Sequence, residues 1–158
     1  MPSLVTIRRL GADDPSLAAA ALQTMHAVFD EPVEPLPPAY IAALLARDDF
    51  WLVAAFDDGA PVGAITAHRL PMTRAATSEL FIYDLAVAES HQRRGIGRAL
   101  VASLREAALA AGIGVAFVPA DDEDDHALAF YRAIGGAAAP VTIFTFDADA
   151  DADAPVRG

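Results

Sequence analysis

The sequence predicts one mixed α/β domain, and three observations carry this prediction. A length of 158 residues fits a single domain. Apolar residues make up 54% of the chain, which is enough for a hydrophobic core. Segments with strand and helix periodicity follow one another in the order β, α, α, β-hairpin, β, α, β, α, β. Because two helices are consecutive and two strands form a hairpin, this order differs from a regularly repeating βαβ array.

The chain begins with a predicted strand and two predicted helices. Val5–Leu10 is the strand. A helix starts at Asp13–Pro15, because an acidic residue suits the N-cap and proline suits the first turn, and its apolar spacing continues to Phe29. Residues 30–38 contain four prolines and three acids, so they form a loop. The second helix is expected over Ala39–Arg47.

A hairpin and a further strand follow. Trp51–Phe56 and Pro61–His68 are apolar runs, and the turn residues Asp57–Ala60 between them indicate a β-hairpin. Leu70–Ser78 is read as a connection. Glu79–Val87 is rich in aromatic and β-branched residues, which favour a strand.

The remaining chain alternates helices and strands. A helix is expected over Gly97–Ala111, with Gly112 at the position of a C-terminal glycine cap. A short strand over Val115–Val118, a helix over His126–Ile134 and a last strand over Val141–Phe146 complete the order. The inward-facing stripe of the first of these helices consists of Ile96, Leu100, Leu104 and Ala108.

The charge of the chain bears on its partners. Acids outnumber bases by 22 to 11, which gives a formal net charge of −11. A nucleic-acid partner is therefore not expected, because the phosphate backbone would repel the chain, whereas a cationic partner is matched. The plainer interpretation is that the acidity serves solubility. The end of the chain, residues 147–158, alternates aspartate with small residues and is expected to be a solvated, disordered tail.

Several classes of site and location are excluded by what the sequence lacks. It has no cysteine, so disulfides, a thiolate nucleophile and cysteine-bound zinc are excluded. The histidines His26, His68, His91 and His126 are scattered without metal-ligand spacing, and no metal site is expected. His91 is read as a loop residue. Neither a signal peptide nor an apolar run of the roughly 18–20 residues that span a bilayer is visible. We therefore expect a cytoplasmic protein without a membrane partner.

The stretch Gln92–Gly97 joins a predicted strand to a predicted helix. A helix N-terminus exposes unpaired N–H groups and the positive end of the helix dipole, and glycines let an anion approach the main chain. Arg93 and Arg94 add positive charge, so a phosphate site is indicated. The plainer interpretation is a strand-to-helix loop with glycines for turning. The stretch lacks the lysine of a P-loop and the third glycine of a dinucleotide fingerprint.

Two motifs resemble those of a known superfamily. Gln92-Arg93-Arg94-Gly95-Ile96-Gly97 resembles the Q/R-x-x-G-x-G/A motif of the GCN5-related N-acetyltransferases (GNAT). Ala127–Gly135 is similar to their A-x-x-x-Y-x-x-x-G segment, and the order of elements agrees over residues 4–146. Glu79–Val87 and Ala120–Asp125 resemble segments of the type I aminoglycoside 3-N-acetyltransferases, the gentamicin acetyltransferases. The loop of residues 30–38 differs from what that narrower group leads us to expect.

The resemblance implies a fold and a cofactor. The fold is a single GNAT-like α/β domain over residues 1–146, with a mixed, mostly antiparallel sheet, a V-shaped splay at the cofactor site and helices on both faces. The co-substrate is acetyl-CoA, its pyrophosphate on the glycine-containing loop. A homodimer is compatible with the resemblance. The implied cofactor-binding residues are Leu85, Ala86, Val87, Gln92, Arg93, Arg94, Gly95, Ile96, Gly97 and Arg98.

The resemblance also implies two catalytic residues. An amine must lose a proton before it attacks a thioester, and Asp84 is the candidate general base. The alternative role for Asp84 is that of a strand-end aspartate that forms a hydrogen bond with the backbone. Tyr131 would protonate the departing thiolate, and its alternative is a tyrosine at the edge of the core. Transfer would be direct within a ternary complex, because no cysteine can form an acyl-enzyme.

The acceptor is expected to be a polycationic amine. Asp121–Asp125 are consecutive acids, of which helix capping explains one or two. Mutual repulsion makes a purely structural role weak, and a site for a polycation is the sharper interpretation. The implied reaction is acetylation of the 3-amino group of an aminoglycoside. The alternatives are another amine (a polyamine, an amino-acid derivative or a protein N-terminus) and a CoA-binding module without turnover. The candidate substrate-binding residues are Glu79, Tyr83, Asp84, Asp121, Asp124 and Asp125.

Overall fold

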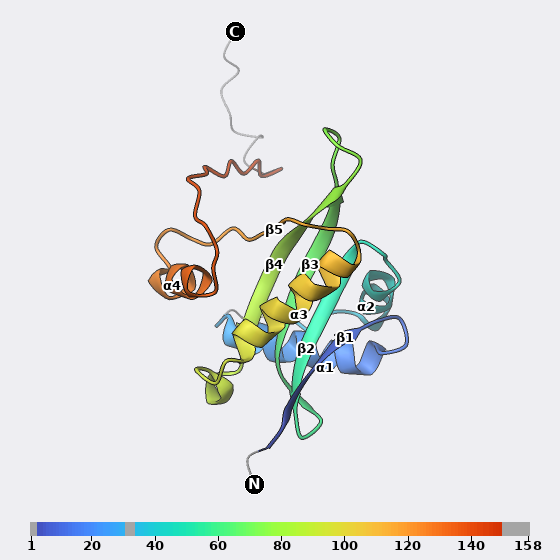
Figure 1. The fold of residues 1–158 in the computed structure, drawn as a ribbon. Coiled ribbons are helices and arrows are strands. Elements are labelled where there is room, and N and C mark those ends of the chain that lie inside the picture. The colour runs from blue at the N-terminus through green and yellow to red at the C-terminus, as the bar shows by residue number, and fades with distance from the viewer. Residues whose placement is uncertain (1–2, 31–33, 150–158) are drawn as a thin grey trace. The chain divides into compact units, whose positions relative to one another are not determined.

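A computed structural model describes residues 3–30 and 34–149 of the chain. The chain divides into two compact units, Met1–Pro119 and Ala120–Gly158. The first unit contains the sheet and three of the helices, and the second contains α4 (Asp125–Ala133) (Figure 1). Each unit is described by itself.

The first unit is built on a sheet in the order β1-β2-β3-β4-β5 (Figure 1). The strands β1 to β4 pair antiparallel, and β5 pairs parallel to β4. The predicted mixed, mostly antiparallel sheet is therefore confirmed. The strands are β1 (Val5–Leu10), β2 (Phe50–Asp57), β3 (Ala60–Pro71), β4 (Ser78–Val87) and β5 (Ala116–Phe117).

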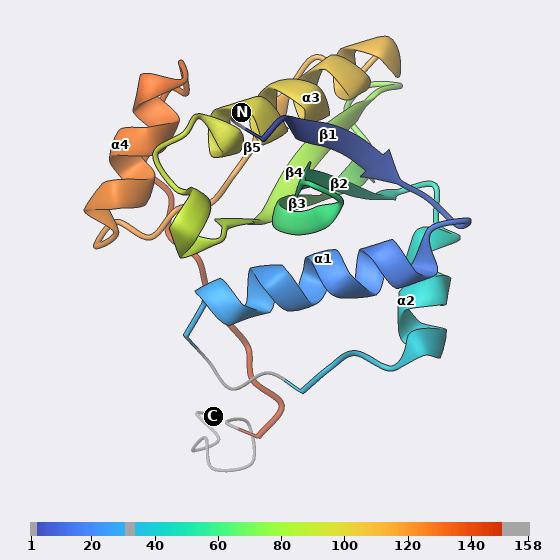
Figure 2. The ribbon, with the colours of Figure 1, turned by 90° about the horizontal axis from the view of Figure 1, so that it is seen from below.

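Helices cover both faces of this sheet. The helix α1 (Pro15–Val28) lies on one side and α3 (Ile96–Ala110) on the other (Figure 2). The helix α2 (Pro38–Leu45) joins α1 in a core cluster with alternate residues of the strands. Because β2 is covered on both faces, all side chains of Phe50–Phe56 are buried.

The sequence pattern of α3 explains its orientation. Ile96, Leu100, Leu104 and Ala108 recur at helical spacing, and each is at most 5% exposed. Leu109, one residue away from this stripe, is 65% exposed. The predicted inward stripe is confirmed. It packs α3 against the sheet, and the N-terminus of α3 lies next to the end of β4.

The turn between β2 and β3 is tighter than the sequence indicated. Asp57 pairs with Ala60, so the loop is only Asp58-Gly59, and both residues have positive φ angles, 51° and 80°. Aspartate and glycine suit this left-handed conformation, and such two-residue turns match the twist of a hairpin. Asp57 is consequently held in the sheet rather than in a loop.

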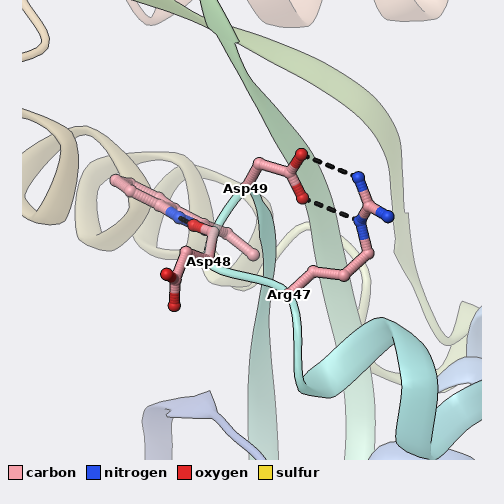
Figure 3. A network of polar contacts seen from close by, with 4 residues as sticks. Arg47, Asp48 and Asp49 are labelled. Atoms are coloured by element: carbon pink, nitrogen blue, oxygen red, sulfur yellow. Dashed lines mark hydrogen bonds and ion pairs between the residues drawn. The ribbon is translucent and has the colours of Figure 1, made fainter.

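An ion pair fixes the entry into β2. Arg47 and Asp49 form two hydrogen bonds of 2.8 Å each, Nε to Oδ1 and Nη2 to Oδ2 (Figure 3). The indole of Trp51 donates to the carbonyl of Asp48 at 3.1 Å, and the guanidinium of Arg9 lies 4.2 Å from the Trp51 ring. The short connection from α2 to the sheet is thus held by side chains at both its ends.

One predicted strand is wrong. Val141–Phe146 has no strand structure, and its large apolar side chains are exposed, with Phe146 89% exposed. Apolar and β-branched residues gave the segment a strand pattern, but a strand also needs a partner for its backbone groups. Among the described residues none pairs with it. In contrast, β3 is longer than predicted, because Leu70 and Pro71 pair with Glu79 and Ser78.

The second unit begins with the helix α4. The carboxylate of Asp124 accepts a hydrogen bond from the amide of Ala127 at 3.0 Å and so caps the helix. Residues 150–158 of the predicted acidic tail lie outside the described residues. In the part of the chain that the structure describes, no helix is long and apolar enough to cross a membrane.

The packing of α3 gives a test of the fold. Leu104→Ala removes a side chain that is 0% exposed and should lower the free energy of unfolding by about 2–5 kcal/mol. Leu109→Ala makes the same chemical change on the exposed face and should change it by less than about 0.5 kcal/mol. Urea unfolding measures both. Equal losses in the two variants would contradict the burial of the predicted stripe.

Candidate active site

The strand β4 contains one extra residue in its middle. Thr66 pairs with Asp84, but the next residue, Ala67, pairs with Ile82, so Tyr83 has no partner opposite it on β3. This is a β-bulge, in which two residues of one strand oppose one of the other. The hydroxyl of Thr66 accepts a hydrogen bond from the amide of Asp84 at 3.2 Å. The bulge therefore fixes the backbone at the candidate base.

The bulge brings Tyr83 and Asp84 to the same face of the sheet. Ala64 and Ala86 pair with each other and belong to the core cluster of α1 and α2. Since side chains alternate along a strand, Asp84, two residues before Ala86, also faces α1. Tyr83 lies against His68 of β3, whose neighbour across the sheet, Phe50, belongs to the same cluster. Without the extra residue, adjacent side chains would point to opposite faces.

Asp84 is half-buried, and its surroundings change its acidity. Burial raises the pKa of the Asp84 carboxyl, because the charged form loses hydration. The charge of His26, on α1, acts in the opposite direction. A base is most effective when its pKa is near the working pH, so the raised value suits proton abstraction better than that of an exposed aspartate.

Beyond this bulge, one edge of β4 is open. The strand β5 pairs with β4 only at Leu80 and Phe81. Within the described residues, no strand pairs with that edge at Leu85, Ala86 or Val87. Among the described residues the sheet is therefore open on this side of β4, as the predicted splay requires, although the Val87 carbonyl accepts a hydrogen bond from the Gln92 side chain.

The loop after β4 leads into α3 through two residues with left-handed backbone conformation. Arg93 and Gly95 have positive φ angles of 60° and 80°, and Gly95 is the N-cap residue of α3. A side chain on Gly95 would find no atom within 4 Å, so the space in front of the helix end is open. Ile96, at the start of the helix, is instead a buried core residue.

The charges around this loop fit a diphosphate. Arg93, Arg94 and Arg98 are exposed at the helix N-terminus, whose amides and dipole also attract anions. Gly97 lies in the first turn of the helix. Gln92 has a structural contact, since its side-chain amide donates to the carbonyl of Val87 at 2.9 Å and ties the loop to β4.

A row of aromatic rings crosses the sheet beside Asp84. Neighbouring ring centroids lie 5.5 Å apart for Phe50 and His68, 5.7 Å for His68 and Tyr83, and 5.7 Å for Tyr83 and Phe81. Phe117 continues the row at 5.2 Å from Phe81. We call these five residues the aromatic row.

The aromatic row runs from the core to the surface. Phe50 is 8% exposed, whereas Tyr83 and Phe117 are 62% and 40% exposed. Glu79 is two residues before Phe81, so it shares this face, and it is half-buried. Ring faces attract cations, and carboxylates stand at both ends of the β4 part of the row, Glu79 and Asp84. This surface can receive an ammonium group.

A cavity lies on the same side of the sheet. Its volume is about 240 Å³. Its polar groups are Gln23 and His26, and His26 is also the residue whose charge acts on Asp84. Neither residue was predicted as part of the site, although a histidine beside the apolar stripe of a helix is a visible signal in the sequence. The apolar residues that line the cavity are Ala19, Leu22, Ala27, Pro35, Leu36 and Ile41.

The other candidate residues belong to the second unit. The Tyr131 ring packs edge-on against Phe130 at 5.1 Å. A side chain on Gly136 would come within 2.9 Å of the Tyr131 carbonyl, which accepts a hydrogen bond from the Gly136 amide at 2.8 Å. Asp121 and Asp124 accept backbone hydrogen bonds at 3.0 Å, so turn and cap formation accounts for part of this acidic run. Asp125 is exposed in the first turn of α4.

No metal cluster accompanies these groups. In residues 3–30 and 34–149, no three histidine, aspartate or glutamate side chains gather closely enough to hold a metal ion.

Known proteins share this architecture. The aminoglycoside acetyltransferase meta-AAC0020, from an uncultured soil metagenomic sample, has a TM-score of 0.86 and 30% sequence identity over 90% of this chain and 95% of its own. It has been crystallised with trehalose and with sisomicin. A second aminoglycoside acetyltransferase from such a sample, HMB0005, has a TM-score of 0.82 and 34% identity over 91% of this chain and 98% of its own.

A curated relative and a family model also match the sequence. The N-alpha-acetyltransferase RimI of Mycobacterium tuberculosis is 33% identical over 102 residues, which are 65% of this chain. The match spans 61% of the length of RimI. The model of the acetyltransferase (GNAT) family matches residues 17–135. The chain therefore belongs to the GNAT family of acetyltransferases, whose cofactor is acetyl-CoA.

Proposed function

We propose that the protein is an N-acetyltransferase that transfers the acetyl group of acetyl-CoA to an amine of a polycationic small molecule. An aminoglycoside is the proposed acceptor and its 3-amino group the proposed position. The observation that carries the proposal is the bulge of β4, because it places Asp84 beside the aromatic row on one face, next to the open strand edge.

Groups at the end of β4 and at the start of α3 are proposed to bind acetyl-CoA. Acetyl-CoA supplies the acetyl group as a thioester. The amides at the start of α3, with Arg93, Arg94 and Arg98, would hold its diphosphate, and the open edge at Leu85–Val87 would offer main-chain hydrogen bonds to the rest of the molecule. These groups would hold the cofactor along the end of β4 that carries Asp84.

Proton transfer is assigned to two side chains. The Asp84 carboxylate takes a proton from the acceptor ammonium, directly or through water, so that the nitrogen lone pair can attack. Tyr131, of the second unit, is the proposed proton donor to the leaving sulfur through its phenolic oxygen. Attack is direct, because the chain has no cysteine for an acyl-enzyme.

The acceptor surface supports a polycation. Glu79 and Asp84 pair with Leu70 and Thr66, which are four residues apart on β3, so their backbone positions are separated by roughly 13 Å at about 3.3 Å per residue. The rings of Phe81 and Tyr83 lie between them. Ammonium groups on linked rings can therefore contact both carboxylates and the ring faces. The crystallisation of meta-AAC0020 with sisomicin supports the same acceptor class.

A second candidate is acetylation of a protein N-terminus. The similarity to RimI over 102 residues favours it. A peptide α-amine carries a single charge, so it would leave either Glu79 or Asp84 on β4 without an ammonium partner.

A panel of acceptors distinguishes these functions. We expect release of free CoA thiol from acetyl-CoA with sisomicin and other aminoglycosides, weaker release with spermidine, and little with a peptide whose only amine is its N-terminus. Mass spectrometry and NMR of the product locate the acetyl group. Preferential turnover of the peptide would favour the second candidate, and no turnover with any amine would favour a CoA-binding module.

The anion loop is tested by Gly95→Asp. A carboxylate in front of the helix should abolish the rise in melting temperature that acetyl-CoA produces in the parent, because it repels the diphosphate. Gly112→Asp is the matched control, since Gly112 has a nearly identical φ of 78° and lies after the other end of α3. Thermal unfolding with and without acetyl-CoA measures this rise in melting temperature, which should be retained in the Gly112→Asp control.

The proposed base is tested by Asp84→Asn. Turnover should fall about 100-fold or more, as expected for loss of a general base. Since burial raises the Asp84 pKa, the ionised carboxyl is less favourable in the folded than in the unfolded chain. At neutral pH the variant should therefore melt at the parent temperature or above it. Glu106→Gln on the exposed face of α3 is the control. Parental turnover in Asp84→Asn would exclude this base.

The acid limb of the rate profile gives an independent measurement. In the parent, kcat/KM should fall with decreasing pH at a pH above the ordinary aspartate range, because the raised pKa keeps Asp84 protonated there. This limb should be absent from the residual activity of Asp84→Asn.

A further inference from the structure

A contact outside these groups connects the β2–β3 hairpin to the loop before α3. The imidazole Nε2 of His91 lies 2.8 Å from Oδ2 of Asp57. On the other side of the ring, the Ser90 hydroxyl lies 2.8 Å from Nδ1. The guanidinium of Arg94 is 3.9 Å from the same Asp57 oxygen. Residues 34 positions apart in the chain are thereby joined at the cofactor loop.

The contact between Asp57 and His91 is largely shielded from solvent and has a defined geometry. The side chains of Asp57 and His91 are only 12% and 20% exposed. The neighbouring Ser3 side chain and the hydrogen bond with His91 lower the pKa of the Asp57 carboxyl, so it stays ionised in the neutral range. A neutral His91 that carries its proton on Nε2 donates to Asp57 and accepts from Ser90, which fixes the orientation of the ring.

The segment that this pair holds begins the cofactor loop. His91 is the last residue of a single turn of 3₁₀ helix, Glu89–His91, and it is followed by Gln92 and by Arg93 in a left-handed conformation. That backbone is unfavourable and positive charges gather there, so the loop needs an anchor to keep one arrangement. Asp57 supplies the anchor from the rigid end of a hairpin.

We propose that Asp57 is a positioning residue for acetyl-CoA, because it holds His91 and thereby sets the loop whose amides and Arg94 meet the diphosphate. The proposal rests on the cofactor of the family and not on the acceptor. Arg94 is 43% exposed, and its contact with Asp57 is long. The carboxylate therefore offsets the charge of Arg94 while the guanidinium stays accessible to phosphate.

Calorimetric titration with CoA tests this proposal on the full chain without any acceptor. Asp57→Asn should weaken CoA binding about tenfold, because a charge-assisted hydrogen bond becomes a neutral one. Asp58→Asn is the matched control: it removes the same charge one residue further on, where the φ of 51° suits asparagine. Its CoA affinity should equal that of the parent.

The role of His91 is separated from stability by two further variants. His91→Gln keeps an N–H donor near the position of Nε2 and should retain CoA binding within about threefold, whereas His91→Ala should lose about tenfold. The double variant Asp57→Asn/His91→Ala should bind CoA no more weakly than His91→Ala alone, since both changes break one contact. Melting temperatures without CoA show whether each variant is folded at the titration temperature.

The outcomes separate this proposal from the others. Equal CoA affinity in Asp57→Asn and Asp58→Asn would overturn it, as would equal losses in His91→Gln and His91→Ala. The steady-state constants add an independent criterion: KM for acetyl-CoA should rise in Asp57→Asn while kcat at saturation stays at the parental value. Failure of the parent to turn over aminoglycosides would leave the CoA titration unaffected and would count against the proposed acceptor alone.

Discussion

The extra residue at Tyr83 is the constraint on which the site depends. A regular strand would direct Tyr83 and Asp84 to opposite faces, and only one of them could meet an acceptor. The bulge brings both to the face that α1 covers, where His26 and the cavity also lie. The hydroxyl of Thr66 accepts a hydrogen bond from the amide of Asp84 and so stabilises this β-bulge.

The two ends of the site carry opposite charge. The chain as a whole has a net charge of −11, yet Arg93, Arg94 and Arg98 gather at the start of α3. Asp57 contacts Arg94 and offsets part of this positive charge. The acids Glu79 and Asp84 lie on β4, which precedes the loop in the chain. Such a separation suits one anionic and one cationic reactant, which would meet near the end of β4.

Local sequence signals predicted much of the fold because their causes are local. The inward stripe of α3 depends on helical spacing, the hairpin on Asp58-Gly59, and the anion loop on Gly95 at the helix N-cap. The motif resemblance gave Asp84 as the candidate base and residues 92–97 as the candidate cofactor loop. Hydrogen bonding also supported the capping interpretation of Asp124, which the sequence had left beside a role in acceptor binding.

The sequence by itself determined the order of elements as far as α4, the left-handed glycine before α3 and the acidic character of the chain, since each follows from spacing, residue type or charge. Only the tertiary structure decided what depends on pairing between distant segments. The register of β3 and β4 created the bulge, α1 brought His26 towards Asp84, and the hairpin brought Asp57 to His91. Pairing also decided against a strand at Val141–Phe146, because strand-like residues form no strand without a partner for their backbone groups.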